Sequence, residues 1–479
     1  MKNRLILLKI ISLDFGILLC YNKNMLIPIP ETLKNFASKL SRPLYVVGGY
    51  VRNFLIAEYI SGDIDLTAPI LLEDMAREVD KEGFAVLKKN DLTGTIVFTD
   101  GKITYEYTAF RTESYKNDGF HTPVSVEFTG DINKDALRRD FTCNAVYYDI
   151  LRDEIIDPTG KGLSDIKAKR IACVRDANIT FSEDGLRLLR LARFSAELNF
   201  SIDKNTLNGA KDNAKRVLAL TGVKVFSELK RILVADTIYP FSNKQGHYDA
   251  LKILDEIGVL EELLPEITLG RGMRQRRNFH KHDVLEHTLR CVLYSDSTVR
   301  LSALLHDVGK PACMMTSGGY FNHHKVGEIL AQRILLRFGA PKSTVTEVCR
   351  LVRFHMKNAD YREEKKVQTR KFVIDNNDIF DKLLCLKQAD FMAGAEKMEI
   401  APSVKAWQMV YADMIKEKVP FSKRELKISS ADLQSIGITG KLLGEVIGVL
   451  FLFVIEHPNQ NEKEILLERA KAFIKENKK

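Results

Sequence analysis

The sequence predicts an α+β protein in which a head with a mixed β-sheet is followed by an all-helical remainder. Short β-rich runs broken by Gly and Asp fill residues 43–157, and helical periodicity replaces them beyond residue 166. The chain has 479 residues, which is too long for one compact core. About three or four packed units are therefore expected.

Runs rich in β-branched and aromatic residues are the predicted strands of the head: 44–47, 64–67, 95–99, 103–110, 124–128 and 145–150. Amphipathic stretches of helical period follow at 183–200, 205–216, 222–234 and 247–263. An irregular basic segment, 270–281, joins them to a histidine-containing helical region from 282 to 400. The end of the chain, 407–479, closes with a charged amphipathic helix and shows no recognisable chemistry.

The charge distribution is compatible with a polyanionic partner. Lys and Arg exceed Asp and Glu by 72 to 63. Residues 271–281 carry five basic side chains and no acidic one, and bases also outnumber acids over 204–231. These stretches suit a phosphate backbone, although solvated helix faces explain either stretch equally well.

The cysteines and the N-terminal residues predict a cytoplasmic protein. Seven cysteines occur without any Cys-x-x-Cys pair, which is typical of a reducing compartment. The apolar run near the start is interrupted by Lys9 and Asp14 and has no cleavage site, so a secretory signal is not expected. Residues 1–24 are interpreted as an N-terminal extension before Met25. No apolar run is long enough to span a bilayer, so no membrane association is expected.

A first candidate site follows the predicted strand at 44–47. Gly48-Gly49 allows a tight turn into a helix whose N-terminus suits a triphosphate. In Asp63-Ile64-Asp65, strand alternation points both carboxylates to one face, a spacing that suits two Mg²⁺ ions. Alone, an Asp-x-Asp pair is more often a solvated strand edge, but its position after Gly-Gly favours the metal site.

Gly48-Gly49-x-Val51-Arg52 followed by Asp63-x-Asp65 resembles motif A of the class II CCA-adding enzymes and bacterial poly(A) polymerases. The family usually has Asp where this chain has Asn53, so a charged role is lost there. The resemblance implies a nucleotidyltransferase head in which Asp63 and Asp65 are catalytic and bind Mg²⁺.

Two further segments extend the resemblance. Glu106-x-x-x-Phe110-Arg111 resembles the strand that supplies a third catalytic carboxylate, and residues 137–145 match motif B closely. Arginines followed by Asp, Thr and Asn offer hydrogen bonds to a triphosphate and a sugar. The nucleotide-binding residues implied for the head are Gly48, Gly49, Arg52, Arg111, Arg138, Arg139, Asp140 and Asn144.

A third motif suggests how the nucleotide is chosen. Glu183-Asp184-x-x-Arg187 with Arg190 resembles motif D of the family, in which protein side chains replace a nucleic acid template. Three residues apart, Asp184 and Arg187 would share one face of a helix and present an acceptor and a donor to a base. A Thr180-x-x-Glu183 capping box with an ordinary Asp184–Arg187 ion pair is the alternative interpretation. The loop 115–123 matches the family's flexible loop weakly, and His121 stands where a basic residue is common.

The helical region contains a second set of metal-ligand residues. His306-Asp307-x-Gly309-Lys310 follows an apolar helix, with other histidines and an aspartate on both sides. The pattern resembles the HD phosphohydrolase superfamily, which some bacterial tRNA nucleotidyltransferases carry as a fused domain. The resemblance implies a divalent metal of unknown identity held by His287, His306, Asp307 and Asp390, with His323 and His355 as accessory residues. His280, His282 and His324 are interpreted as bystanders.

The predicted domains are an extension (1–24), a nucleotidyltransferase head (25–165), a helical neck and body that binds tRNA (166–275), an HD domain (276–400) and a helical tail (401–479). The expected function is addition of C, C and A to the 3′ end of tRNA from CTP and ATP. An A-adding enzyme, a CC-adding enzyme or a poly(A) polymerase remains an alternative, because the motifs serve all these branches. A metal-dependent HD phosphohydrolase with an RNA-binding head is the alternative from another class.

Overall fold

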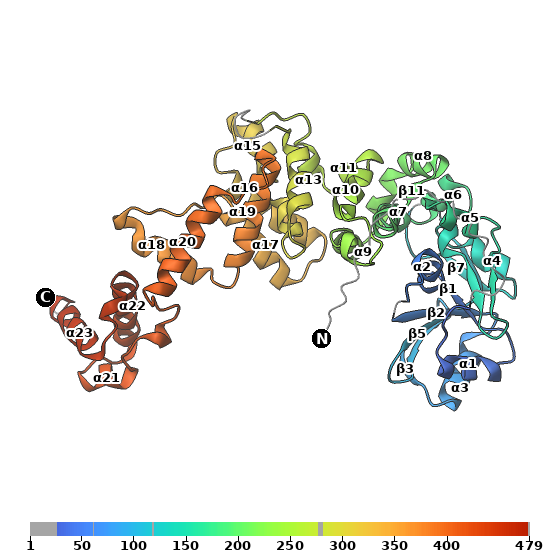
Figure 1. Cartoon of the computed structure of the whole chain (residues 1–479), viewed down its shortest axis with the longest axis horizontal. Coiled ribbons are helices and arrows are strands. Elements are labelled where there is room, and N and C mark those ends of the chain that lie inside the picture. Colours follow the sequence, from blue (N-terminus) through green and yellow to red (C-terminus); the bar gives the residue numbers. More distant parts are fainter. Residues whose placement is uncertain (1–25, 61, 117–118, 276–280, 478–479) are drawn as a thin grey trace, which may run out of the picture. The chain divides into compact units, whose positions relative to one another are not determined.

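The computed structural model describes residues 26–60, 62–116, 119–275 and 281–477 (Figure 1). The expected extension at 1–24 therefore lies outside the described residues. The chain divides into two compact units. The first contains the residues up to 113 together with 126–168, and the second contains 114–125 together with 169–479.

The first unit is built on a mixed seven-stranded sheet in the order β3-β4-β5-β2-β1-β8-β9. Its strands are β1 (Tyr45–Val47), β2 (Asp63–Ala68), β3 (Ala85–Asn90), β4 (Thr95–Thr99), β5 (Thr104–Ala109), β8 (Tyr147–Asp149) and β9 (Glu154–Ile156). β2 and β5 pair in parallel, and the other pairs are antiparallel. A mixed sheet was the prediction from the sequence, and it is confirmed.

Two of these strands were not predicted. β3 (Ala85–Asn90) is solvent-exposed along its whole length and contains a register shift between Val86 and Lys88. It therefore lacks the alternation of apolar and polar residues that marks a half-buried strand. β9 (Glu154–Ile156) has only three residues and gives too short a pattern to recognise.

Helices α1 (Glu31–Lys39) and α3 (Leu72–Lys81) cover one face of the sheet. Phe36 of α1 packs against Phe84 and Phe98, with ring centroids 5.2 and 5.9 Å away. α3 packs against β3 and β4. Strand residues alternate between the two faces of a sheet. The residues that alternate with the buried ones, such as Asp63, Asp65 and Glu106, therefore lie on the opposite face, which we call the front face. It carries the polar side chains described below.

The neck and body of the second unit are helical: α6 (Ala177–Glu183), α7 (Leu186–Leu198), α8 (Lys204–Asp212), α9 (Gly222–Ile232), α10 (Gly246–Glu256) and α11 (Val259–Leu263). Arg193 in α7 is buried and bonds Glu197 at 2.9 Å and Glu228 of α9 at 2.6 Å. The expectation of an all-helical remainder is wrong in one detail. β10 (Arg170–Ile171) and β11 (Ser201–Ile202) pair in parallel, because the extended segments on either side of the α6–α7 pair run side by side.

The HD region contains α13 (Val284–Tyr294), α14 (Arg300–Leu305), α15 (Gly309–Ser317), α16 (His323–Arg337), α17 (Lys342–Phe354), α18 (Lys366–Asp375) and α19 (Phe380–Ala395). α13 packs against α14 and α19, and α16 packs against α15 and α17. The N-terminus of α13 is fixed by Asp283, whose carboxylate accepts the Glu286 backbone N–H at 2.8 Å.

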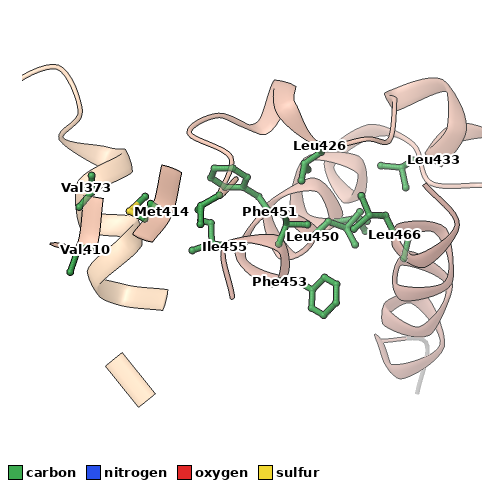
Figure 2. Close-up of a cluster of buried hydrophobic side chains, with 14 of the residues drawn as sticks. Val373, Val410, Met414, Leu426, Leu433, Leu450, Phe451, Phe453, Ile455 and Leu466 are labelled. Atoms are coloured by element: carbon green, nitrogen blue, oxygen red, sulfur yellow. The ribbon is translucent and has the colours of Figure 1, made fainter. Parts of the chain in front are cut away.

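The C-terminal part has a separate apolar core (Figure 2). It is formed by α20 (Pro402–Lys416), α21 (Ser430–Ser435), α22 (Gly440–Glu456) and α23 (Lys463–Asn477), together with α18. Figure 2 shows Leu433, Leu450 and Leu466, which come from α21, α22 and α23 respectively. Although α22 is strongly apolar, no helix among the described residues has the length and hydropathy needed to cross a bilayer.

Candidate functional site

The turn between β1 and α2 (Gly49–Ala57) requires glycine at position 48. Gly48 has φ 75°, which L side chains rarely adopt, and a Cβ there would lie 3.1 Å from Oδ2 of Asp65. α2 has no side-chain N-cap, so its first backbone N–H groups are not capped by a side chain. The turn thus brings the N-terminus of a helix, which favours anions, next to an acidic side chain of β2.

Three carboxylates share the front face of the sheet. Asp63 and Asp65 are exposed in β2 while Ile64 between them is buried, as the alternation predicted. Glu106 in β5 is the register partner of Asp65 on the adjacent parallel strand. Desolvation, and then the negative charges of Glu106 and Asp63, raise the pKa of Asp65 to about 6. A divalent cation between these side chains would offset the repulsion, and hard oxygen ligands are those that Mg²⁺ prefers.

The two arginines of motif B are held by an aspartate that the sequence analysis did not identify. Asp135 is fully buried and accepts from Nε of Arg138 at 2.8 Å, Nη2 of Arg139 at 3.0 Å and the hydroxyl of Tyr147 at 2.7 Å. Although burial opposes ionisation, the guanidinium groups of Arg139 and Arg138 lower the pKa of Asp135 to about 2. The spacing of three and four residues between Asp135 and these arginines was the available signal.

Arg52 links motif A to motif B inside the head. Its side chain is 2% exposed, bonds Oδ1 of Asn53 through Nε at 3.1 Å and Nη2 at 2.9 Å, and bonds Oδ1 of Asn144 through Nη1. Asn144 also donates to Asp140 at 3.0 Å. The Asn53 amide nitrogen is buried and finds no hydrogen-bond acceptor within the described residues.

Arg111 is held by two hydrogen-bond acceptors. Its Nε donates to Glu113 at 2.7 Å, and its Nη1 donates to the backbone carbonyl of Thr93. Glu113 also lies 3.5 Å from Arg138. The expected nucleotide-binding arginines of motif B and Arg111 are thus connected through Asp135 and Glu113.

The motif D residues lie in the second unit and differ from the expected arrangement. Asp184 and Arg187 were expected on one helix face, but α6 ends at Glu183 and α7 begins at Leu186, so Asp184 lies in an extended break between helices. The Asp184 carboxylate accepts the backbone N–H of Leu186, the first residue of α7, at 2.9 Å across this break. Asp184 and Arg187 still lie 3.8 Å apart and both are buried.

The surroundings of motif D rule out the proposed capping box. α6 is capped by Asp176, and the hydroxyl of Thr180 donates to the Asp176 carbonyl instead of capping a helix. Arg187 donates to the Thr180 carbonyl at 3.1 Å and lies 3.5 Å from Glu183. Arg190 lies over the ring of Phe194 at 5.1 Å.

The loop 115–123 is anchored beside motif D. His121 Nδ1 lies 2.8 Å from Oδ2 of Asp184. The Gly119 N–H donates to the Ser182 carbonyl, and the Gly185 N–H donates to the Gly119 carbonyl. Gly119 has φ 85° and a Cβ there would meet the Arg216 carbonyl oxygen at 2.7 Å, so only glycine fits.

The HD region gathers six side chains from five helices or helix ends into one buried cluster. Two groups each place three ligand atoms within 4.8 Å of one another: His287, His306 and Asp390, and Asp307, His323 and His355. These are the only groups of this kind within the described residues. The four expected metal ligands therefore do not form one group. Asp307 belongs to the second group, although its carboxylate also lies close to the first. Its Oδ2 lies 3.1 Å from Nε2 of His306, and its Oδ1 lies 3.4 Å from Nε2 of His323.

The imidazole orientations in this cluster suit metal coordination. Nδ1 of His306, His323 and His355 each lies 2.7 Å from the backbone carbonyl three residues earlier. Such a bond fixes the proton on Nδ1 and leaves Nε2 as the lone-pair donor. Burial, and then the nearby His306, lower the pKa of His355 to about 3, which keeps that ring neutral.

Around the cluster, Lys310 lies 2.5 Å from Oδ2 of Asp307 and donates to Gln275 at 2.6 Å. Lys387 donates to the His355 carbonyl at 2.7 Å. Among the three expected bystanders, His282 bonds Glu396 at 2.8 Å, His324 meets the ring of His323 edge-on, and His280 lies outside the described residues.

Comparison with known proteins agrees with this division of the chain. Residues 44–172 match the poly A polymerase head domain, and residues 284–390 match the HD domain. A CCA-adding enzyme of Geobacillus sp. (strain WCH70) is 34% identical over 215 residues, which is 45% of this chain and 49% of that protein. An A-adding tRNA nucleotidyltransferase of Deinococcus radiodurans is 28% identical over 67% of this chain and 74% of that protein.

The chain thus carries a poly A polymerase head domain and an HD domain, and it is similar to tRNA nucleotidyltransferases. Its fold agrees with that of the Bacillus stearothermophilus CCA-adding enzyme in complex with CTP, with a TM-score of 0.64, 23% identity and coverage of 94% of this chain and 100% of the other. The Thermotoga maritima CCA-adding enzyme complexed with tRNA gives a TM-score of 0.52 at 18% identity, over 92% of this chain and 94% of the other. The matched stretch spans about half the length of the Geobacillus relative.

The buried amide nitrogen of Asn53, which finds no acceptor within the described residues, makes this position testable. In Asn53→Asp the buried amide donor disappears and Arg52 gains an ionic acceptor, so we expect the head to be stabilised by about 1 to 3 kcal/mol. Urea unfolding measured by far-UV circular dichroism checks this. Asn53→Ala, which leaves the Arg52 guanidinium with fewer acceptors, should be destabilised, and a loss of stability in Asn53→Asp would contradict the explanation.

Proposed function

We propose that this chain is a tRNA nucleotidyltransferase that adds C, C and A to the 3′ end of tRNA from CTP and ATP. The observation that carries the proposal is the carboxylate face of Asp63, Asp65 and Glu106 beside the N-terminus of α2. Its domains in this proposal are the head (25–165), the tRNA-binding neck and body (166–275), the HD domain (276–400) and the tail (401–479).

In the proposed reaction, Asp63 and Asp65 hold Mg²⁺ and Glu106 assists them. Mg²⁺ supplies charge stabilisation for attacking and leaving oxygens in an in-line displacement. The RNA 3′ oxygen forms a bond to the α-phosphorus, the bond to pyrophosphate breaks, and the hydroxyl proton passes to solvent. Gly48 and Gly49 admit the triphosphate to the helix N-terminus, and Arg138 and Arg139, preset by Asp135, offer further donors.

Asp184 and Arg187 are the proposed selectors of the incoming base. Both are buried, and Asp184 is an acceptor while Arg187 is a donor. The proposed partners are tRNA, CTP and ATP. Similar solved structures include complexes with CTP, ATP and tRNA, which supports this choice. Addition of A alone is the alternative, because the Deinococcus relative is an A-adding tRNA nucleotidyltransferase. Sequencing the ends that the protein adds to tRNA lacking CCA will distinguish the two activities.

The histidine cluster favours a second activity, metal-dependent hydrolysis of a phosphoester. His287, His306 and Asp390 would hold one divalent cation and Asp307, His323 and His355 another, and Asp307 lies close to residues of both groups. A metal would supply an activated water there. In this proposal the HD site would hydrolyse a phosphoester at the RNA end, and the head would then add nucleotides to that end.

Two substitutions separate catalysis from base selection. Asp63→Ala should reduce the addition of every nucleotide at least about a hundredfold, because the charge that holds the metal is lost. Arg187→Ala should instead reduce the preference for CTP and ATP over UTP and GTP by about ten- to a hundredfold, since each unpaired buried group costs about 1 to 3 kcal/mol. Labelled incorporation into tRNA lacking CCA, by variants shown to be folded, measures both. If both Asp184→Ala and Arg187→Ala keep the wild-type preference for CTP and ATP, these two side chains do not select the base.

A pH dependence follows from the raised pKa of Asp65. Below about pH 6 a proton competes for this carboxylate, so Mg²⁺ affinity of the head should fall by up to about tenfold for each pH unit, whereas above about pH 6 it should level off. Calorimetric Mg²⁺ titration of the full chain between pH 5 and 8 tests this. Asp65→Asn should bind weakly and lose the dependence. An unchanged affinity of the wild type across this range would be inconsistent with Asp65 as a ligand.

The cation number of the HD cluster is measurable by metal analysis of the full chain carrying Asp63→Ala and Asp65→Ala, which removes the head site. We expect two Mn²⁺ ions in this background, one after His355→Ala, and none after Asp307→Ala, because Asp307 contacts both groups. His324→Ala is the matched control, since His324 neighbours His323 but lies outside the cluster. A single ion that is unaffected by His355→Ala would show that the second group is not a site.

A further inference from the structure

One side of helix α22 (Gly440–Glu456) stays exposed although the helix is strongly apolar. Its opposite side packs into the C-terminal core, where Leu450, Phe453 and Ile455 are buried (Figure 2). Val449 and Leu452 lie outside that core and are 40% and 41% exposed. Two neighbouring apolar side chains of one helix are therefore left in contact with water, which is a feature of interaction surfaces.

The exposed residues of α22 recur at helical spacing. Lys441, Glu445, Val449, Leu452 and Glu456 are all exposed and follow one another after three or four residues. Residues at this spacing lie on one side of a helix, so these five form a continuous stripe, which we call the outer face. The outer face thus has an apolar middle, Val449 and Leu452, between charged residues at both ends.

The backbone of α22 is accessible beside this apolar middle. A Cβ at Gly444 or Gly448 would meet no other heavy atom within 4 Å. The distance between packed helices, about 8 to 10 Å, depends on the side chains at the contact, so a position without a side chain allows a close approach. Gly448 directly precedes Val449, and the outer face therefore offers a projecting side chain and an open position next to each other.

The charged ends of the outer face have only weak contacts within the chain. The Lys441 side chain is 94% exposed and lies 3.9 Å from Glu445. The Glu456 side chain is 54% exposed and lies 4.0 Å from His457. Ion pairs with this exposure and these distances contribute little to stability. Both charges can therefore meet an opposite charge on another molecule without breaking a strong contact.

We propose that the outer face binds the outer face of a second copy of this chain, with the two α22 helices antiparallel. In a two-fold symmetric pair centred between Gly448 and Val449, Lys441 of each copy lies opposite Glu456 of the other, so two ion pairs form. Val449 of each copy then lies opposite Gly448 of the other, and Leu452 packs beside it. A parallel pair in register would instead oppose like charges at both ends.

The charges of the outer face favour this partner over a membrane or an RNA. The outer face carries two carboxylates, Glu445 and Glu456, and one ammonium group, Lys441. Helices that bind anionic membranes carry mainly Lys and Arg on their polar side, and binding of an RNA backbone also requires an excess of positive charge. A face of mixed charge suits a copy of itself, because each sign meets the other in the symmetric pair.

The expected dimer is weak. From Lys441 to Glu456 the outer face is about 22 Å long. A single helix pair of this length buries less than the about 1,200 Å² that is typical of stable interfaces. We therefore expect a dissociation constant in the micromolar range, and salt should raise it by screening the two ion pairs.

Sedimentation velocity of the full chain at low salt, between about 1 and 100 μM, tests the proposal. Leu452→Glu, which places a carboxylate in the apolar middle, should weaken dimerisation at least about tenfold. Lys441→Glu and Glu456→Lys should each weaken it about three- to tenfold, because each opposes like charges at two symmetry-related contacts. The variant that carries both reversals should recover the wild-type constant. Lys471→Glu in α23 is the matched control, since Lys471 is exposed but lies outside α22.

A monomer at every concentration, or a dimer that Leu452→Glu leaves unchanged, would overturn the inference. A double charge-reversal variant that dimerises more weakly than either single variant would overturn the antiparallel arrangement and with it the inference. Flotation of a monomeric wild type with vesicles of phosphatidylcholine and phosphatidylglycerol, abolished by Leu452→Glu, would show that the outer face binds lipid instead. Thermal unfolding followed by far-UV circular dichroism checks that each variant is folded. If Leu452→Glu is unfolded, the two charge reversals decide the question.

Discussion

The contact between the Gly48 turn and Asp65 is the constraint on which the arrangement of the head depends. Gly48 has no Cβ, and a Cβ at this position would lie only 3.1 Å from a carboxylate oxygen of Asp65. The same turn ends β1 and begins α2, so the strand, the helix N-terminus and the acidic face have fixed positions relative to one another. Any larger residue at this position would press on the Asp65 carboxylate and would also strain a φ of 75°.

The HD cluster also brings carboxylates together, but in different surroundings from those in the head. The head gathers like charges at an open face, where desolvation and Glu106 raise the pKa of Asp65. In the HD cluster, two carboxylates lie among four imidazoles and Lys310, which pairs with Asp307. Three of its rings are oriented by carbonyls of their own helical turn, so the orientation is encoded locally although the ligands come from distant segments.

Much of this organisation could be predicted from the sequence, because short motifs encode local geometry. The Asp63–Asp65 alternation and the order of the motifs needed only strand periodicity. The break at Asp184 could not be predicted in this way, because a spacing of three residues fits a continuous helix and a helix start equally well. β3 was missed since its bulge and full exposure remove the alternating pattern. The division of the HD ligands into two groups depends on long-range packing of helices that no local pattern contains.

The way Asp135 holds the motif B arginines explains why these positions are arginine and not lysine. A guanidinium carries five N–H donors in one rigid plane, so the bonds of Arg139 to Asp135 and Tyr147 fix that plane without using every donor. An ammonium group rotates about its stem and would not keep a fixed direction after one such bond. Asp135 thus acts as an internal counterion that orients the cationic groups in advance, so less conformational entropy would be lost if they bound the polyphosphate of the proposed reaction.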